Sequence, residues 1–169
     1  MITFEKGKKR FAFRIAGVAI SNNNILLHRS VEDDFWALPG GRCELLENSK
    51  DTLIREIKEE IGVEIKIVRP LYFVENFFNY ENRACHEVSI IYLMQFFPES
   101  KKIVERNTFY GHESQLGFEK DEVYGKELRL IFRWFNINEL ENLEVYPSFL
   151  RTSLKNIKPY PEHIIHKDN

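Results

Sequence analysis

The chain has 169 residues, of which 43% are hydrophobic and 30% charged, and its formal net charge at pH 7 is −2. This length and composition are typical of one globular domain with a single core, and they exclude a disordered or fibrous chain. The weak negative charge argues against a nucleic-acid partner. No apolar run reaches the roughly 20 residues of a membrane span and no signal peptide is recognisable, so we expect a cytoplasmic protein without a membrane partner.

The first elements expected along the chain are a hairpin and a short strand. Residues 11–21 and 25–29 have strand patterns, and three consecutive asparagines between them supply the turn. The basic residues that precede this hairpin are expected to form a solvated N-terminal arm or an edge strand within residues 1–10. A further short strand is expected at residues 35–38, before Pro39-Gly40-Gly41. The two cysteines, Cys43 and Cys85, lack the spacing of a metal or redox motif and are expected to be unpaired thiols.

One long helix is predicted, over residues 49–61. Asn48 or Ser49 supplies its N-cap, and Gly62 is placed to end it.

Strands are expected to dominate the rest of the chain. The predicted segments are strands at residues 64–78, 87–97 and 127–135, a turn at 79–82, a long loop or lid at 98–124, helices at 137–143 and 148–156, and a frayed tail at 159–169. Because strands and helices alternate irregularly, these elements predict an α+β domain with a mixed, curved sheet between helices.

The predicted helix gathers three carboxylates beside its apolar stripe. At 100° per residue its apolar side chains share one arc, and the adjoining arc carries Glu56, Glu59 and Glu60. A solvated helix face is the ordinary explanation of several glutamates, but such a face usually intersperses opposite charges. Like charges at these spacings repel, and a bound cation would resolve the conflict.

The residues before the helix supply further parts of a phosphoryl-transfer site. Gly40 and Gly41 allow the backbone to approach a ligand closely and leave carbonyl oxygens available to a hard cation. Glu47 lies at the entrance of the helix. Cations that neutralise phosphate charge and a carboxylate that orients or deprotonates water are what metal-assisted phosphoryl chemistry needs.

From Gly41 to Val63 the chain resembles the Nudix box, G-x5-E-x7-R-E-U-x-E-E-x-G-U, in which U is a bulky aliphatic residue. Every specified position matches: Gly41, Glu47, Arg55, Glu56, Ile57, Glu59, Glu60, Gly62 and Val63. The flanking segments at 36–41 and 133–135 are also similar to sequences of this family. The resemblance extends over residues 11–150 and implies an α/β/α sandwich around a mixed sheet, with the carboxylate helix packed on it.

The resemblance also implies roles for the residues of the box. Glu59 and Glu60 would be metal ligands, Glu56 a metal ligand or base, Glu47 an auxiliary ligand, and the Gly40 carbonyl a further ligand.

Arg55 would orient the glutamates through charge-assisted hydrogen bonds. The implied cofactor is Mg²⁺, with Mn²⁺ as a substitute, and the implied reaction is attack of water on one phosphorus of a diphosphate.

Residues outside the box are assigned more weakly. We expect a loop carboxylate to assist, preferably Glu127, with Glu113, Glu119, Asp121 and Glu122 as alternatives. Arg29 is a candidate for phosphate contact. Phe77, Phe78 and Tyr80 are candidates for stacking on a nucleobase, although aromatic residues in strands more often belong to the core.

The leading interpretation is therefore an Mg²⁺-dependent pyrophosphohydrolase. Its partner would be a small nucleoside diphosphate derivative, such as an ADP-ribose-like compound, a nucleotide sugar, a dinucleoside polyphosphate or a nucleoside triphosphate. A non-catalytic binding or sensor domain and an isoprenoid diphosphate isomerase are the alternatives, and a homodimer stays open. An mRNA-decapping role is disfavoured because the sequence shows no extended basic surface.

Overall fold

The computed structural model describes residues 1–100, 106–114 and 127–168. Its elements are β1 (Thr3–Lys6), β2 (Lys9–Ser21), β3 (Asn24–Ser30), β4 (Gly40–Arg42), α1 (Ser49–Ile61), β5 (Ile65–Tyr80), β6 (Arg83–Phe96), η1 (Pro98–Ser100), β7 (Thr108–Ser114), β8 (Glu127–Asn136), η2 (Ile137–Asn142), α3 (Leu150–Ser153), η3 (Leu154–Asn156) and β9 (Glu162–Lys167). Within the described part, no helix is long and apolar enough to cross a membrane.

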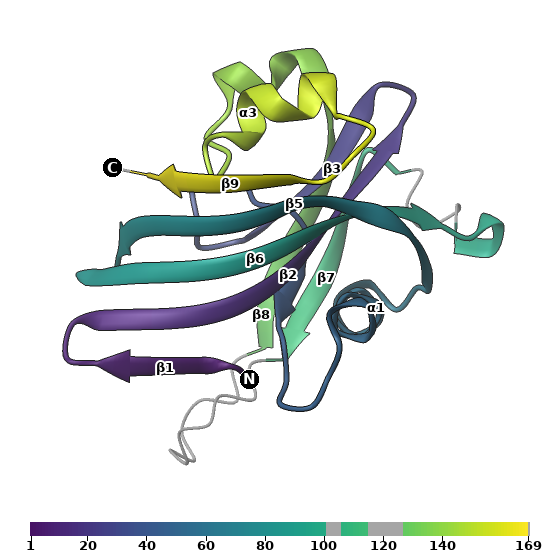
Figure 1. Cartoon of the computed structure of the whole chain (residues 1–169). Helices are drawn as coiled ribbons and strands as arrows, with labels where there is room; N and C mark the ends of the chain where they lie inside the picture. Colours follow the sequence, from purple (N-terminus) through teal and green to yellow (C-terminus); the bar gives the residue numbers. More distant parts are fainter. Residues whose placement is uncertain (101–105, 115–126, 169) are drawn as a thin grey trace.

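The described strands form one mixed, curved sheet in the order β7-β8-β3-β2-β6-β5-β9, and β1 and β4 also pair with β2. β2 runs parallel to β6 and antiparallel to β3, β1 and β4. The sheet is not closed, and Figure 1 shows α1 on one side of it and the short helices around α3 on the other. This arrangement confirms the expected mixed sheet between helices.

Alternation along β2 divides the core between the two faces of the sheet. Ile15 and Ala19 belong to the buried cluster that contains Leu53 and Ile57 of α1. Side chains at the intervening positions of the strand, such as Val18, belong to the cluster under α3. Because alternate side chains of a strand point to opposite faces, this parity tells which face each strand residue lines.

Local sequence signals set both ends of α1. The Asn48 side chain accepts hydrogen bonds from the backbone N–H groups of Lys50 and Asp51. Gly62 takes a left-handed conformation, with φ of 77°, and its N–H donates to the Lys58 carbonyl at 2.9 Å. The helix therefore begins and ends where capping residues predict.

The hairpins are confirmed and three other expectations are wrong. Residues 35–38 make only isolated bridges, at Trp36 and Ala37. The stretch expected to be a loop contains β7, which pairs with β8. The tail expected to fray forms β9, which pairs in parallel with β5, because Ile164 packs against the core under α3. Each of these elements depends on a distant pairing partner that local sequence does not reveal.

Candidate active site

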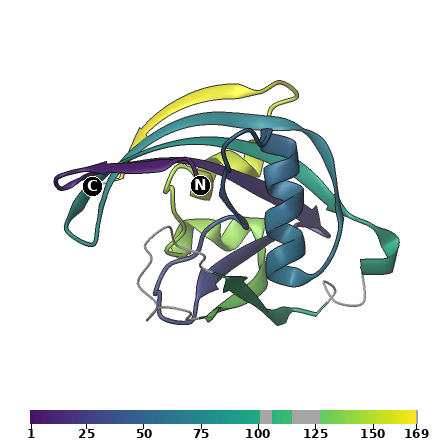
Figure 2. The ribbon, with the colours of Figure 1, turned by 90° about the horizontal axis from the view of Figure 1, so that it is seen from below.

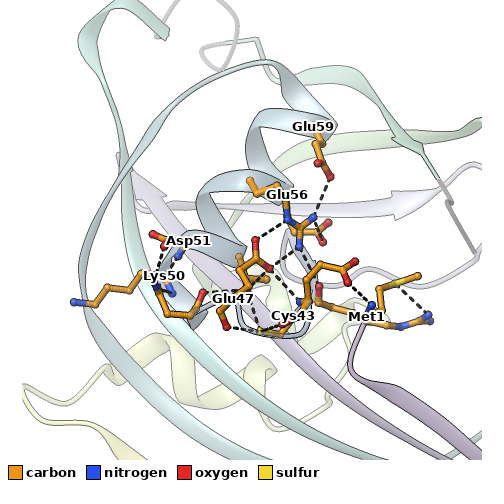
Figure 3. A network of polar contacts seen from close by, with 12 residues as sticks. Met1, Cys43, Glu47, Lys50, Asp51, Glu56 and Glu59 are labelled. Carbon is orange, nitrogen blue, oxygen red and sulfur yellow. Dashed lines mark hydrogen bonds and ion pairs between the residues drawn. The ribbon is translucent and has the colours of Figure 1, made fainter. Parts of the chain in front are cut away.

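Arg55 is the centre of a polar network between α1 and the loop before it (Figure 3). Its Nε and Nη2 donate to the two carboxylate oxygens of Glu47 at 2.8 and 3.0 Å. Its Nη1 donates to Glu56 at 2.8 Å and to Glu59 at 3.1 Å. Nη2 also donates to the Arg42 carbonyl at 3.2 Å, so one guanidinium holds two helix carboxylates, the loop and β4 in fixed positions.

Both carboxylate oxygens of Glu47 accept hydrogen bonds. Besides Arg55, its Oε2 accepts from the Thr52 hydroxyl at 2.8 Å and from the Glu44 N–H at 3.1 Å. Chiefly the hydrogen bonds from Arg55, with help from Glu44 and Thr52, lower the pKa of Glu47 to about 2. A cation would have to displace these donors, so the geometry favours Glu47 as an anchor of Arg55 over the auxiliary-ligand role expected from sequence.

Glu47→Gln should lower the free energy of unfolding by about 1 to 3 kcal/mol at pH 7, because it weakens charge-assisted hydrogen bonds. The pKa of Glu47 is lower in the folded than in the unfolded state, so its stabilisation is present above about pH 4.5 and lost as pH falls toward 2. Urea unfolding between pH 7 and pH 3 should show wild type and variant converging.

A suitable control for this series is Glu64→Gln, because the Glu64 side chain is 67% exposed and its ion pair with Lys58 is solvated. A difference between wild type and Glu47→Gln that stayed constant with pH would contradict the anchoring role.

The Glu56 carboxylate sits directly over Gly41. A Cβ on Gly41 would lie 2.2 Å from the carboxyl carbon, so the missing side chain makes the space that the carboxylate fills. The Glu56 side chain is only 14% exposed. Burial raises its pKa, while Arg55 and, more weakly, Arg14 act in the opposite direction. A cation beside this carboxylate would offset the cost of burying its charge.

Glu60 lies deeper than Glu56, with 4% of its surface exposed. Its Oε2 is 3.8 Å from Nδ1 of His28, which comes from β3. Burial, and secondly the charge of Arg14, lowers the pKa of His28 to about 3, so the imidazole is neutral at pH 7 and does not balance the charge of Glu60. Glu59 differs from both neighbours, because its side chain is 48% exposed.

Gly40, whose carbonyl is the further ligand expected from the sequence, lies on β4 beside Gly41. Its φ is 135°, and a Cβ there would lie 2.2 Å from the Ile15 carbonyl oxygen, so only glycine fits. The Arg42 carbonyl oxygen accepts a hydrogen bond from Arg55. Carbonyls two residues apart in a strand point the same way, so the Gly40 carbonyl oxygen is expected on the same side of β4.

These donors fit a hard divalent cation. Two buried carboxylates and a backbone carbonyl are the ligand types that Mg²⁺ takes. In the described part of the chain, no group of three or more His, Cys, Asp or Glu side chains has a metal-binding arrangement. The rest of a coordination shell would therefore come from water and from substrate phosphate oxygens.

Two arginines lie on β2 and β3, whose alternation turns both side chains toward the α3 face of the sheet. Arg29 of β3 donates through Nη1 to the Asp33 carbonyl, its guanidinium carbon lies 5.2 Å from the centre of the Trp36 ring, and its Nε has no hydrogen-bond partner in the structure. Arg14 was not among the candidate residues expected from the sequence, although an arginine within an apolar strand can indicate a functional position. Its Nη2 donates to the Leu38 carbonyl at 3.2 Å. Its positive charge lowers the pKa of Glu56.

The aromatic candidates do not form one group. Phe77 points to the α1 face and stacks on His86 at 4.4 Å, whereas Phe78, next along the strand, lies on the opposite face. Tyr80 is 39% exposed and its ring lies 6.2 Å from the Phe35 ring.

The loop carboxylates cannot be placed beside the site. Glu127 begins β8 opposite Ser114, but its side chain lies outside the described part. The same holds for the side chain of Glu113. Glu119, Asp121 and Glu122 lie outside the described residues altogether.

The family model described as the NUDIX domain matches residues 12–156. With the box residues assembled on α1 and β4 of a mixed sheet between helices, the chain belongs to the NUDIX family.

Sequence relatives match over a limited segment. YjhB of Bacillus subtilis (strain 168), whose provisional name is ADP-ribose pyrophosphatase, is 35% identical over 72 residues, which are 43% of this chain and 35% of that protein. The m7GpppN-mRNA hydrolase of Saccharomyces cerevisiae (strain ATCC 204508 / S288c) is 45% identical over 65 residues, which are 37% of this chain and 6% of that protein. The chain thus spans about a third or less of these relatives.

Solved structures match over most of the chain. The MutT protein of Bacillus halodurans gives a TM-score of 0.58 with 14% identity, covering 92% of this chain and 89% of that one. A UDP-X diphosphatase gives 0.56 with 15% identity, covering 95% and 69%. At such identities the similarity shows the fold alone.

Proposed function

We propose that the chain is a divalent-metal-dependent pyrophosphohydrolase acting on a nucleoside diphosphate linked to another moiety. The observation that carries this proposal is the placement of Glu56 and Glu60. Both carboxylates are buried on α1, Glu56 is seated on Gly41, and the neighbouring histidine is neutral. Glu56 keeps an ion pair with Arg55, and a cation beside the two carboxylates would offset the remaining cost of burying their charges.

In this proposal Glu56, Glu60 and the Gly40 carbonyl would hold Mg²⁺, for which Mn²⁺ can substitute. The ion supplies neutralisation of phosphate charge and activation of water. Arg55 fixes the orientation of Glu56 and Glu59 through its hydrogen bonds. Glu59, the most exposed of the three glutamates, is the carboxylate that a water nucleophile reaches from solvent.

Arg14 and Arg29 are proposed to bind the phosphates. The charge of Arg14 lowers the pKa of Glu56, and the Arg29 Nε donor has no hydrogen-bond partner among the described residues. A guanidinium satisfies phosphate oxygens through several parallel N–H bonds. The nucleoside would then extend from these arginines toward Tyr80 and Phe35, whose rings are in contact.

A substrate screen tests the proposal. Purified protein should hydrolyse at least one of ADP-ribose, nucleotide sugars, dinucleoside polyphosphates or nucleoside triphosphates when Mg²⁺ or Mn²⁺ is added, and EDTA should abolish the reaction. Hydrolysis in ¹⁸O-labelled water would identify the phosphorus attacked. Binding of these compounds without turnover under any metal condition would contradict the proposal and favour a ligand-binding domain.

A further inference from the structure

A row of side chains crosses the sheet beyond the reach of α1. The register pairs Phe4 with Phe11, Phe11 with His86, His86 with Phe77, and Phe77 with Lys167. Directly paired residues share a face, so this row runs over β1, β2, β6, β5 and β9 on the α1 side. Figures 1 and 2 show that the ends of these strands project away from the helix.

The rings of this row are in contact with one another. Phe4 and Phe11 stack with centroids 4.9 Å apart, and Phe77 and His86 stack at 4.4 Å. Phe11 meets His86 edge to face at 5.3 Å. Phe4, at the open end of the row, is 63% exposed, and His86 keeps a buried Nε2 without a hydrogen-bond partner in the structure. The stacked pairs cover each other's faces, so the open aromatic surface of the row is that of Phe4 at its end.

Cations border these rings. Lys6 and Lys9 pair in the next row outward, and Lys167 ends the aromatic row. All three are exposed, and none of them has an ion-pair partner among the residues that the structure describes. Asp168 also lines the groove, but its carboxylate accepts from the Ser148 N–H on the other face.

The rings and lysines line a groove of about 570 Å³. This volume lies within the range of small-ligand sites. The groove lining includes none of the box residues and neither Arg14 nor Arg29. The groove is therefore separate from the carboxylates of α1.

The charge and the shape of the groove indicate which kind of ligand it binds. In a two-fold contact a second copy of this chain would bring the same uncompensated lysines close to one another, so self-association through the groove is disfavoured. Exposed rings flanked by cations are the combination with which proteins bind unpaired bases and their phosphates. We propose that this groove binds a single-stranded nucleic-acid segment, with a base stacked on Phe4 at the open end of the aromatic row and phosphates on Lys6, Lys9 and Lys167. The chain's net charge of −2 argued against a nucleic-acid partner, because a sum over the whole chain does not reveal a local group of lysines.

Fluorescence anisotropy with labelled ten-nucleotide oligo(U) and oligo(dT) tests the proposal. The measurements are made in EDTA, so that they are independent of the proposed hydrolysis. Lys6→Glu/Lys9→Glu should weaken binding at least about tenfold and reduce the slope of log affinity against log salt by about 1.4, which corresponds to two phosphate contacts. The matched control is Lys50→Glu/Lys66→Glu, which makes the same charge change at exposed positions outside the groove.

A ring variant separates stacking from charge. Phe4→Ala should weaken binding about fivefold or more without loss of folding, because Phe4 is 63% exposed. Tyr160→Ala, at a side chain 59% exposed and outside the groove, should leave binding unchanged. The proposal is overturned if wild type binds neither oligonucleotide, if both lysine pairs weaken binding equally, or if Phe4→Ala has no effect.

Discussion

Glu60→Gln and Glu56→Gln should each lower kcat by at least about a hundredfold on whichever pyrophosphate the enzyme hydrolyses. Each change removes a buried negative charge that the proposed cation needs, while the side chain keeps its size. The metal-free variants should be at least as stable as wild type, because a buried charge is relieved. Steady-state kinetics with saturating Mg²⁺ and melting curves in EDTA would measure the two effects.

The outcome of these substitutions distinguishes a metal site from a structural cluster. Glu64→Gln changes an exposed carboxylate just after α1 and should leave both kcat and Tm near wild type. Normal turnover in either buried variant would remove that residue from the proposed site. A large loss of Tm in EDTA would show that the carboxylate serves packing instead.

Gly41→Ala should lower kcat by about a hundredfold with little loss of stability. The added methyl group would occupy the place of the Glu56 carboxylate, which lies at the end of a flexible side chain and can move away. A displacement of about 1 Å in a catalytic group is enough for a loss of this size. Kinetics, urea unfolding and a Mn²⁺ titration of the variant would separate lost activity from lost folding.

The neighbouring glycine gives the opposite expectation. Gly40→Ala would collide with the Ile15 backbone at a φ of 135°, so it should cost at least about 2 kcal/mol of unfolding free energy. Gly62→Ala, at a φ of 77° with open space around it, should cost about 1 kcal/mol and leave kcat unchanged. If Gly41→Ala behaved like Gly62→Ala, the seating of Glu56 would not matter for catalysis.

The parts of the structure that local sequence determines could be predicted. The bounds of α1 follow from Asn48 and Gly62, and the box residues lie on one helix and the loop before it. The neighbourhood of Glu60 could not be predicted, because His28 and Arg14 reach the site from separate strands. The solvent exposure of the glutamates could not be predicted either. Glu59 and Glu60 are adjacent in sequence, yet Glu59 is largely solvated and Glu60 is buried.

Long-range pairing accounts for the other differences. β9 is short and mostly polar, and only its parallel pairing with β5 makes it a strand. The aromatic row likewise exists only when five strands are in register. In the sequence Phe4, His86 and Phe77 are far apart, so the groove could not be predicted from any single segment.

The position of Arg55 has a consequence for the carboxylate site in the absence of a metal ion. Because the guanidinium already contacts Glu56 and Glu59, the site carries its own permanent counter-ion. Without a bound cation these two carboxylates are partly neutralised by Arg55, which keeps the loop and the helix together. In the proposed metal site, Glu56 and Glu59 would exchange part of their contact with Arg55 for contact with the ion.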